Sequence, residues 1–377
     1  MDELTQLLSD LVAIDSTNPD LVPGAAGEAE IAHFIRSWFE HAGLAVQVIE
    51  AAPGRPNVVG LARGTGGGKT LVLNGHMDTV GTGDMQRPHH PVIKNGRLYG
   101  RGAYDMKSGL AACMLTAAEA RKRGLRGDVI VQAVVDEEYA SIGTAALASR
   151  FMADGAIVAE FTELRLIAAH KGFVWLEIET LGKAAHGSRP DLGVDAISKM
   201  GKVLVELDFL QQRLRARPRH PLLGTGSIHA SLIRGGQELS SYPDHCVLSV
   251  ERRTLPGETP GQTEEELAQL VARLRHADPT FQAVIRRGLD RSPLETPRAS
   301  AIFRSALAAA DGVLRRVPEI AGVGFWTDAA LLSAAGVPSL LFGPSGAGAH
   351  AAEEWVDLQS VRTCADVYLQ TAINFCG

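Results

Sequence analysis

The pattern of hydrophobic and polar residues divides the chain into regions of two different kinds. In the first, apolar residues recur at helical spacing over Leu4–Val12 and Ile31–Phe39. Helical patterns at Gly109–Arg123 and Ser141–Met152 then alternate with short apolar strands. These expected strands are Ala45–Glu50, Asn57–Leu61, Thr70–Asn74, Asp128–Val135 and Ala156–Ala159. Such alternation predicts an α/β fold, with a mostly parallel sheet flanked by helices.

From about Gly172 the pattern changes. Phe173–Thr180 alternates between apolar and polar residues, which is typical of a half-buried strand. Further helices are expected near Val194–Leu214 and Thr263–His276, and further strands near Ser227–Ile233, Cys246–Thr254 and Phe281–Arg287. Two helices with four alternating strands predict a ferredoxin-like α+β unit.

The α/β pattern returns from about Ser300, with a helix, the apolar strand Ser339–Phe342 and a closing helix near Leu358–Phe375. We therefore expect one domain to be inserted into the other. The predicted catalytic domain comprises residues 1–171 and 292–377, and residues 172–291 form the inserted domain.

Composition narrows the class of protein. The 377 residues are 45% hydrophobic, which supports more than one sizeable core. The net charge of −6 without basic runs argues against a nucleic-acid or anionic-membrane partner. No stretch approaches the roughly 18 apolar residues of a membrane span, and the acidic start of the chain shows no secretory signal. Four scattered cysteines fit buried thiols in a reducing cytoplasm.

Residues that commonly bind metals stand near the ends of the predicted strands. His76 and Asp78 come just past an apolar strand and share one side of it. Asp78 is placed to orient His76, because a histidine ligand usually gives its second N–H to a carboxylate. Asp105 precedes the helix Gly109–Arg123 in a glycine-rich segment, where a simple capping role is the alternative.

More acids and a second histidine follow. The apolar strand Asp128–Val135 ends in Asp136, Glu137 and Glu138, a clustering of like charges that costs energy unless a cation offsets it. Glu160 ends a later strand, and His350 comes after the strand of residues 339–342. Ligands of open α/β sheets bind at the carboxyl edge of the strands. Imidazole and carboxylate without thiolate suit zinc, manganese or cobalt.

In order along the chain, the motifs NGHMDTV, GRGAYDMKSG, DEEYASIGT, the acid Glu160 and GAGAHAAEEWV resemble the metallopeptidase M20 family. That family includes acetylornithine deacetylase, succinyl-diaminopimelate desuccinylase, aminoacylase and glutamate carboxypeptidase. The resemblance covers essentially the whole chain. It implies a zinc-dependent amidohydrolase with an inserted lid or dimerisation domain, through which two chains form a homodimer.

The resemblance also implies a role for each residue of the motifs. Asp105 would bridge two zinc ions per chain, for which cobalt or manganese can substitute. His76 and Glu160 would complete the shell of one ion, and Glu138 and His350 that of the other. The resemblance implies two further catalytic residues that are not metal ligands. Glu137 would be the general base for a water shared by the metals, and Asp78 would orient His76.

The inserted domain would contribute to the same site. His186, in GKAAHGSRPD, resembles the histidine that stabilises the oxyanion, in the active site of the partner subunit. Arg253 matches the arginine that binds the substrate's α-carboxylate, and its neighbour Arg252 is the alternative. Two positions depart from the family: Phe161 replaces a common proline, and the substrate-binding position usually held by asparagine is Ser240.

Several substrates remain open within this resemblance. Relatives with glutamate at the position of Glu160 tend to be deacylases, which favours hydrolysis of an N-acyl-L-amino acid, as in acetylornithine deacetylase. A carboxypeptidase or dipeptidase acting on short peptides is the alternative. A non-catalytic ligand-binding relative is the third reading, although the six inner positions are filled here.

Overall fold

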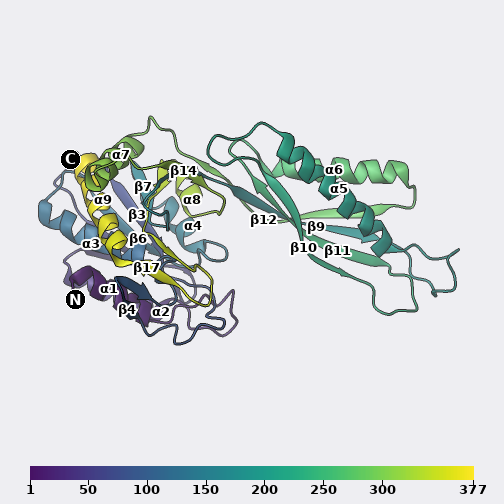
Figure 1. Ribbon diagram of the computed structural model, residues 1–377, viewed down its shortest axis with the longest axis horizontal. Coiled ribbons are helices and arrows are strands. Elements are labelled where there is room, and N and C mark those ends of the chain that lie inside the picture. The colour runs from purple at the N-terminus through teal and green to yellow at the C-terminus, as the bar shows by residue number, and fades with distance from the viewer. The chain divides into compact units, whose positions relative to one another are not determined.

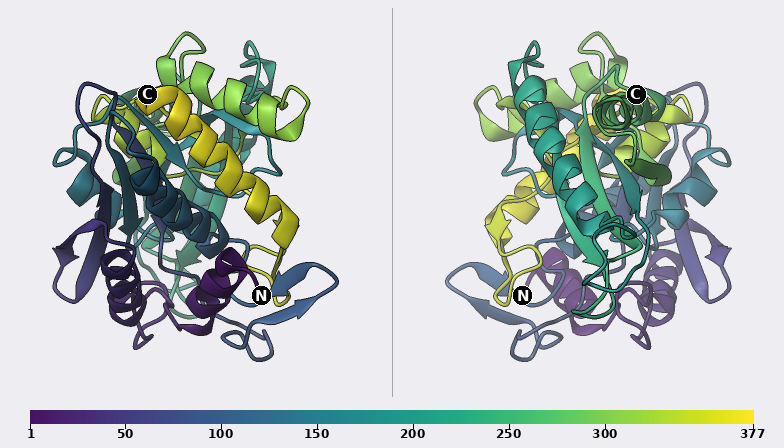
Figure 2. Two further views of the ribbon diagram at one scale, coloured as in Figure 1. Left: turned by 90° about the vertical axis from the view of Figure 1, so that its left-hand side faces the viewer. Right: turned by 90° about the vertical axis from the view of Figure 1, so that its right-hand side faces the viewer.

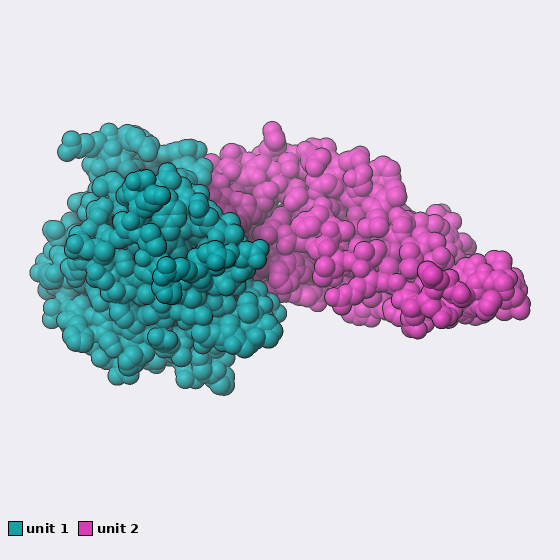
Figure 3. Space-filling view, turned by 60° about the horizontal axis from the view of Figure 1, so that its bottom comes forward, with its two compact units in different colours: residues 1–168, 296–321, 327–377 teal, residues 169–295, 322–326 magenta.

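The computed structural model describes residues 1–377, which form two compact units. Unit 1 comprises Met1–Ala168, Thr296–Ala321 and Thr327–Gly377, and unit 2 comprises Ala169–Glu295 and Gly322–Trp326 (Figure 3). None of the helices is long and apolar enough to cross a membrane.

Unit 1 is an α/β unit whose sheet is parallel at its centre and antiparallel at its edges. The strands follow the order β1-β2-β6-β3-β7-β15-β8, and the pairs β6–β3, β3–β7 and β7–β15 are parallel. These strands are β1 (Ala45–Ala52), β2 (Arg55–Ala62), β3 (Leu71–His76), β6 (Val129–Val134), β7 (Gly155–Val158), β15 (Ser339–Leu341) and β8 (Leu166–His170). Short strands β13 (Leu294–Glu295) and β14 (Ile320–Val323) lie where the chain passes between the units.

Helices cover both faces of this sheet (Figures 1 and 2). One face carries α3 (Lys107–Arg123), α7 (Ala301–Leu314) and α9 (Leu358–Cys376), and the other carries α4 (Ile142–Ala148) and α8 (Ala329–Ala334). The N-terminal helices are α1 (Glu3–Ala13), which packs on α3, and α2 (Ala29–His41), which packs on β1 and β2. Gly109 lets α3 approach β7, since a Cβ there would lie 1.9 Å from the carbonyl oxygen of Ala159.

Unit 2 has the ferredoxin-like order of strands and helices. Its antiparallel sheet has the strand order β10-β11-β9-β12, and α5 and α6 cover one face (Figure 1). The elements are β9 (Gly172–Leu181), α5 (Ala196–Ala216), β10 (Ser227–Gly235), β11 (His245–Thr254), α6 (Pro260–Ala277) and β12 (Gln282–Arg291). Val174, Leu176 and Ile178 of β9 join the core beneath the helices, as their alternation predicts. Both parts of the predicted fold class are thus confirmed.

Two features differ from the sequence-based expectation. The helix expected over Ser141–Met152 is only α4, because Arg150 and Phe151 both donate their N–H to the carbonyl of Leu147 and close the last turn. A small antiparallel sheet was not anticipated, since its strands are short and largely exposed. It consists of β16 (Gly346–Ala347), β17 (Trp355–Asp357), β5 (Arg97–Tyr99) and β4 (Val92–Lys94).

Candidate metal centre

The predicted ligands meet at the carboxyl edge of the sheet in unit 1. His76 ends β3, Glu137 and Glu138 follow β6, and Glu160 follows β7. These strands are parallel neighbours, so their carboxyl ends lie side by side. Asp105 comes from the loop between β5 and α3, where its peptide bond to Met106 is cis. His350 follows β16 and completes what we call the metal cluster: His76, Asp105, Glu137, Glu138, Glu160 and His350.

Asp105 lies between the two histidines. Its Oδ1 is 3.2 Å from His76 Nε2, and its Oδ2 is 3.3 Å from His350 Nε2. The other carboxylates divide between the same two histidines. Glu160 Oε1 lies 3.7 Å from His76 Nε2, whereas Glu138 Oε2 lies 3.1 Å from His350 Nε2. The carboxylate of Asp105 therefore lies between two sets of donors, one around His76 and one around His350.

Glu137 lies beside the first of these sets. Its Oε2 is 3.9 Å from His76 Nε2, and its side chain keeps 11% of its surface exposed. Burial raises the pKa of Glu137 well above its ordinary value, and the neighbouring Glu160 carboxylate raises it further. A carboxyl group with a raised pKa is suited to accept and return a proton near neutral pH.

Asp78 holds the turn that carries the two glutamates. Its Oδ1 accepts the N–H of Glu137 at 3.1 Å, and its Oδ2 accepts that of Glu138 at 3.2 Å. The Nδ1 atom of His76 lies 2.9 Å from the backbone oxygen of Asp78 and 3.5 Å from Asp78 Oδ1. The hydrogen bond that orients the His76 ring thus goes to the Asp78 backbone, while the carboxylate that the sequence suggested lies at ion-pair distance.

The four carboxylates of the metal cluster have only two histidines to offset their negative charge, and their pKa values reflect this. Burial, with Asp105 nearby, raises the pKa of Glu138 to about 7 and that of Glu160 well above its ordinary value. Burial would lower the pKa of His76, but its hydrogen bond to Asp105 and the surrounding carboxylates raise it instead. Buried carboxylates at this density need protons or cations to offset their repulsion.

The donor set fits metal ions. One ligand atom each of His76, Glu137 and Glu160 lies within 4.8 Å of the others, and the same holds for His76, Asp105 and Glu138. Imidazole nitrogen and carboxylate oxygen without thiolate are the donors of hydrolytic zinc sites and also suit manganese and cobalt. The residues present therefore fit the metal centre that the sequence predicts.

Comparison with known proteins shows the family of the chain. Residues 72–374 match the model of peptidase family M20/M25/M40. The chain belongs to this family. It is 31% identical to acetylornithine deacetylase of Myxococcus xanthus, over 99% of this chain and 98% of that one. It is also 29% identical to N-formyl-4-amino-5-aminomethyl-2-methylpyrimidine deformylase of Bacillus subtilis, over 100% of this chain and 95% of that one.

Solved structures show the same fold at low sequence identity. Aminopeptidase PepT of Bacillus cereus has a TM-score of 0.81 at 19% identity, with 99% of this chain and 98% of that chain covered. The M20 carboxypeptidase Sso-CP2 of Sulfolobus solfataricus has a TM-score of 0.79 at 17% identity, with 100% and 99% covered. As an M20 protein, the chain is a hydrolase related to enzymes that act on amides.

The structure adds an ion-pair network around the buried Arg55 that sequence reasoning did not identify in this M20 chain. Arg55 Nη2 lies 2.6 Å from Glu28 Oε1 and 3.2 Å from Asp136 Oδ1, and Arg55 Nη1 lies 2.6 Å from Asp20 Oδ2. We call these four residues the arginine cluster. Asn18 Nδ2 links it to the metal centre, donating to Asp136 at 3.0 Å and to Asp78 at 2.8 Å.

Asp328 is another acid near the metal cluster that carried no sequence signal of its own. It is fully buried at the start of α8, and its Oδ2 accepts the hydroxyl of Thr144 at 2.6 Å. Burial raises its pKa to about 6. Like the carboxylate of Glu160, that of Asp328 raises the pKa of Glu137, and so it favours the protonated form of Glu137.

The predicted residues of the inserted domain all lie in unit 2. Arg253 is half-buried on the open face of the sheet, paired with Glu251, and its guanidinium lies 5.5 Å from the centre of the Phe173 ring. Arg252 points the other way, is buried, and pairs with Glu258 at 2.7 Å. Of the two arginines, only Arg253 is therefore available on the open face.

His186 and Ser240 lie in neighbouring loops at the opposite end of that sheet. Gly187 donates its N–H to the carbonyl of Ser240 at 2.7 Å, and His186 is exposed. In unit 1, the second departure from the family, Phe161, stacks on Tyr104 with ring centres 4.5 Å apart. Tyr104 in turn donates its hydroxyl to Glu163. Phe161 directly follows Glu160 and Tyr104 directly precedes Asp105, so this aromatic contact joins the sequence neighbours of two predicted ligands.

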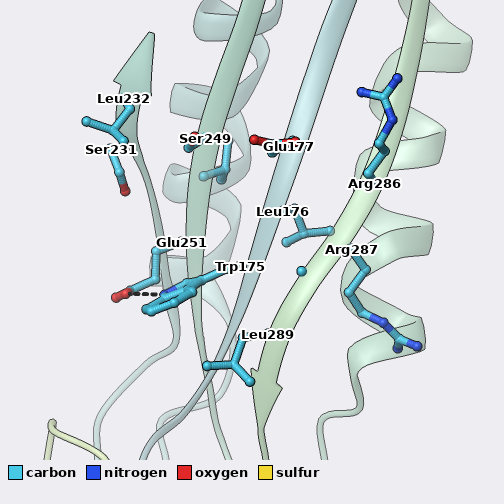
Figure 4. Close-up of a pocket in the computed structure, with 12 residues that line it drawn as sticks. Trp175, Leu176, Glu177, Ser231, Leu232, Ser249, Glu251, Arg286, Arg287 and Leu289 are labelled. Carbon is cyan, nitrogen blue, oxygen red and sulfur yellow. Dashed lines mark hydrogen bonds between the residues drawn. The ribbon is translucent and has the colours of Figure 1, made fainter. Parts of the chain in front are cut away.

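A hollow in unit 2 is separate from these ligands. It has a volume of about 620 Å³ on the open face of the unit 2 sheet, and Trp175, Leu232 and Leu289 line it with charged neighbours (Figure 4). Trp175 donates its indole N–H to Glu251 at 3.0 Å. No residue of the metal cluster lines this hollow, so its size says nothing about the metal centre.

Proposed function

We propose that this M20 hydrolase uses two zinc ions to cleave the amide bond of N-acyl-L-amino acids. The observation that carries the proposal is Asp105, whose two carboxylate oxygens face different histidines 3.2 and 3.3 Å away. In this arrangement His76, Asp105 and Glu160 would hold one ion. Asp105, Glu138 and His350 would hold the other.

The ions would supply an acidified water and a polarised substrate carbonyl. Glu137 would take the proton of that water and return it to the departing amine, for which its raised pKa is suited. Asp78 would keep Glu137 in place, because it accepts the Glu137 N–H. The exposed Glu137 side-chain surface leaves the proton acceptor within reach of a substrate.

Recognition of the substrate would fall to unit 2. Arg253 would bind the α-carboxylate, since its guanidinium lies on the open face and is oriented by Glu251 and Phe173. His186 would donate a hydrogen bond to the oxyanion, and Ser240 in the adjoining loop would contact the substrate.

Two relatives point to related substrates. The acetylornithine deacetylase similarity supports a small N-acyl amino acid. The similarity to a deformylase of an aminopyrimidine supports a second candidate, an N-formyl amine that carries no carboxylate. The peptidase structures keep a short peptide as a further alternative, although at their identity they show the fold alone.

A hydrolysis screen tests the proposal. The protein would be stripped with a chelator, reloaded with zinc, cobalt or manganese, and assayed on N-acetyl, N-succinyl and N-formyl compounds and on dipeptides. We expect metal-dependent release of an amine, with about two ions bound per chain. Hydrolysis that survives complete metal removal would overturn the mechanism, and activity restricted to N-formyl amines without carboxylates would favour the second candidate.

We also propose that the chain acts as a homodimer through unit 2. Its strand β10 is an edge strand on which Leu232 and Ile233 are exposed, and the adjacent helix α5 exposes Val205 and Phe209. An exposed apolar edge strand is a natural pairing surface for a second copy. Burying this surface would satisfy the free strand edge of both chains.

The positions of His186 and Arg253 support a site shared between subunits. Phe173 pairs with Arg253 at one end of the sheet, and Leu181 pairs with His245 at the other, next to the His186 loop. Eight residues of strand span roughly 27 Å at about 3.4 Å per residue. A small substrate bound by Arg253 of one chain would therefore require His186 from another.

Mixing two inactive variants tests the shared site. A His186→Ala chain and an Asp105→Ala chain should each be inactive, and mixed dimers should regain part of the activity because one site then has both residues intact. Absence of any recovery in dimers shown to have exchanged subunits would contradict the proposal. Sedimentation of a Leu232→Lys variant checks the interface separately, with a monomer expected.

The cysteines support a reducing compartment, and we propose the cytoplasm. All four are buried and unpaired. Burial raises the pKa of the Cys113 and Cys364 thiols, which keeps them protonated and unreactive.

A further inference from the structure

A buried carboxylate organises the loop that presents Asp105. Glu354 comes just before β17 and is 2% exposed. Its Oε1 accepts the backbone N–H groups of Tyr104 at 2.9 Å and Asp105 at 3.1 Å, and its Oε2 accepts that of Gly102 at 3.0 Å. Three amides of one loop therefore converge on a single side chain, in the manner of an anion-binding nest.

An arginine from the same loop balances this charge. Arg101 is also buried, and its Nη1 donates to Glu354 Oε2 at 2.8 Å. Its Nη2 donates to the carbonyl of Ala351 at 3.0 Å. The backbone adds another tie, because Gly100 donates its N–H to the carbonyl of Glu354 at 3.1 Å. These contacts continue the pairing of β5 with β17.

The same contacts reach the loop of His350. Ala351 directly follows this histidine, and Glu354 is only four positions further along. His350 adopts a positive φ of 62°, and Gly348, two positions before it, has a φ of 87°. A loop in so particular a conformation needs fixed attachments to keep the imidazole in place. The Arg101–Glu354 pair provides two of them.

We propose that Glu354 is a positioning residue that holds Asp105 and His350 in one arrangement, so that its loss weakens the ion bound by Asp105, Glu138 and His350. The inference rests on the proposed pair of metal ions. Glu354 touches neither ion nor substrate in this scheme. It acts through the backbone of one ligand and the loop of another.

The other ion should depend on Glu354 much less. His76 ends β3 and Glu160 follows β7, and both strands belong to the central parallel sheet, whose hydrogen bonds do not involve Glu354. Only Asp105 is shared between the two ions. The expected signature is therefore unequal: a strong loss of affinity for one ion, and a small loss for the other.

Metal binding to a Glu354→Gln variant tests the inference. The amide nitrogen of glutamine cannot accept hydrogen bonds from N–H groups, whereas its amide oxygen still can, so the substitution breaks about half of the contacts and keeps the shape. The matched control is Glu353→Gln, the same change at the neighbouring exposed position. Stripped protein would be titrated with zinc against a competing chelator, with the melting temperature of the metal-free form and kcat recorded in parallel.

We expect the weaker-bound zinc of Glu354→Gln to lose about 10- to 100-fold in affinity, as is typical when a partner of a metal ligand is removed. The tighter ion should change by less, excess zinc should restore most of kcat, and Glu353→Gln should behave like the unmodified protein. If Glu354→Gln binds each of the two ions as tightly as the unmodified protein does, the inference is overturned. An unmodified protein that binds fewer than two ions would instead overturn the proposed function.

A second variant covers the case in which Glu354→Gln does not fold. Arg101→Met removes one donor from Glu354 and leaves the three amides in place. It should weaken the same ion by a smaller factor. A folded Arg101→Met protein that binds both zinc ions as the unmodified protein does would count against a positioning role for the pair.

Discussion

Unit 1 contains two groups of mostly buried carboxylates, and they differ in where the compensating positive charge comes from. In the arginine cluster the chain supplies its own cation, since the guanidinium of Arg55 lies 2.6 Å from both Asp20 and Glu28. In the metal cluster four carboxylates share only two histidines. In the first arrangement each carboxylate contacts the guanidinium of Arg55 within 3.2 Å, although burial still raises the pKa of Glu28. In the second, Glu137 and Glu160 come no closer than 3.7 Å to a histidine, and burial raises the pKa of both well above the ordinary value. Buried carboxylates thus form ion pairs within the chain in the arginine cluster, whereas in the metal cluster they remain able to bind an added cation.

The largest expected effect comes from Glu137→Gln in the metal cluster. The substitution removes the proton acceptor but none of the proposed ligands, so turnover should fall on the order of 10³-fold or more. Zinc content should stay near that of the unmodified protein, measured by elemental analysis beside kcat. Glu138→Gln is the contrasting variant and should lose zinc. Loss of zinc in Glu137→Gln instead would mean that the two glutamates have exchanged roles.

Arg55→Met should break the arginine cluster, with an effect on stability instead of chemistry. It leaves Glu28 and Asp136 buried without their cation, which typically costs about 3–5 kcal/mol. Urea unfolding would measure the loss. The control is Arg36→Met, which removes an exposed i,i+4 pair with Glu40 and should cost under about 0.5 kcal/mol. Equal losses for the two variants would show that the buried network carries no special weight.

The sequence predicted more of the metal cluster than of the arginine cluster. Each metal-cluster residue stands in a recognisable motif near the end of an apolar strand, so local patterns locate it. Arg55 and Glu28 have no such motif, and their contact arises only when segments 27 residues apart fold together. Glu354 stands inside the motif GAGAHAAEEWV, but its role is not visible there, since the backbone amides that it accepts lie about 250 positions earlier.

The fold shows the same division. Long strands and helices with clear periodicity were predicted because burial imposes their pattern. The short sheet of β4, β5, β16 and β17 was missed because Val92–Lys94 is fully exposed and carries no such pattern. That small sheet nevertheless adjoins the loops that carry Asp105 and His350, because Asp105 follows β5 and His350 lies between β16 and β17. The roles of individual site residues remain predictions, because they depend on ions and substrate.

The pH dependence of stability should distinguish metal-free from metal-loaded protein. Burial raises the pKa of Glu138 from 4.5 to about 7 and that of Asp328 from 3.8 to about 6. A carboxyl group with a raised pKa holds its proton more tightly in the folded state, so the free energy of unfolding falls as pH rises between the two values. Hydrogen bonds to Asp105 and Glu138 raise the pKa of His350 from 6.5 to about 10, so its stabilising contribution is full below about pH 6.5 and is lost progressively as the pH rises toward 10.

These shifts all have the same sign. The metal-free protein should therefore lose stability as pH rises from about 5 to 7. Above that range the buried Lys107, whose pKa burial lowers to about 7, contributes in the opposite direction. With excess zinc the slope should be flat or reversed, because metal binding releases protons and strengthens with pH. Urea unfolding at several pH values, with and without chelator, measures both. A metal-free protein whose stability rises over this range would contradict the assignment of uncompensated charge to the metal cluster.

The smallest expected effect lies at Asn18, the residue that joins the two clusters. Its amide donates to both Asp78 and Asp136, and Asp78 in turn holds the backbone of Glu137. Asn18→Ala should cost about 1–3 kcal/mol through unsatisfied buried acceptors and lower kcat a few-fold. Asn18→Asp sharpens the point, because it replaces the donor with another buried acid. It should destabilise more than alanine does, as measured by urea unfolding, whereas an equal or smaller loss would show that Asn18 fills space and does not link the charges.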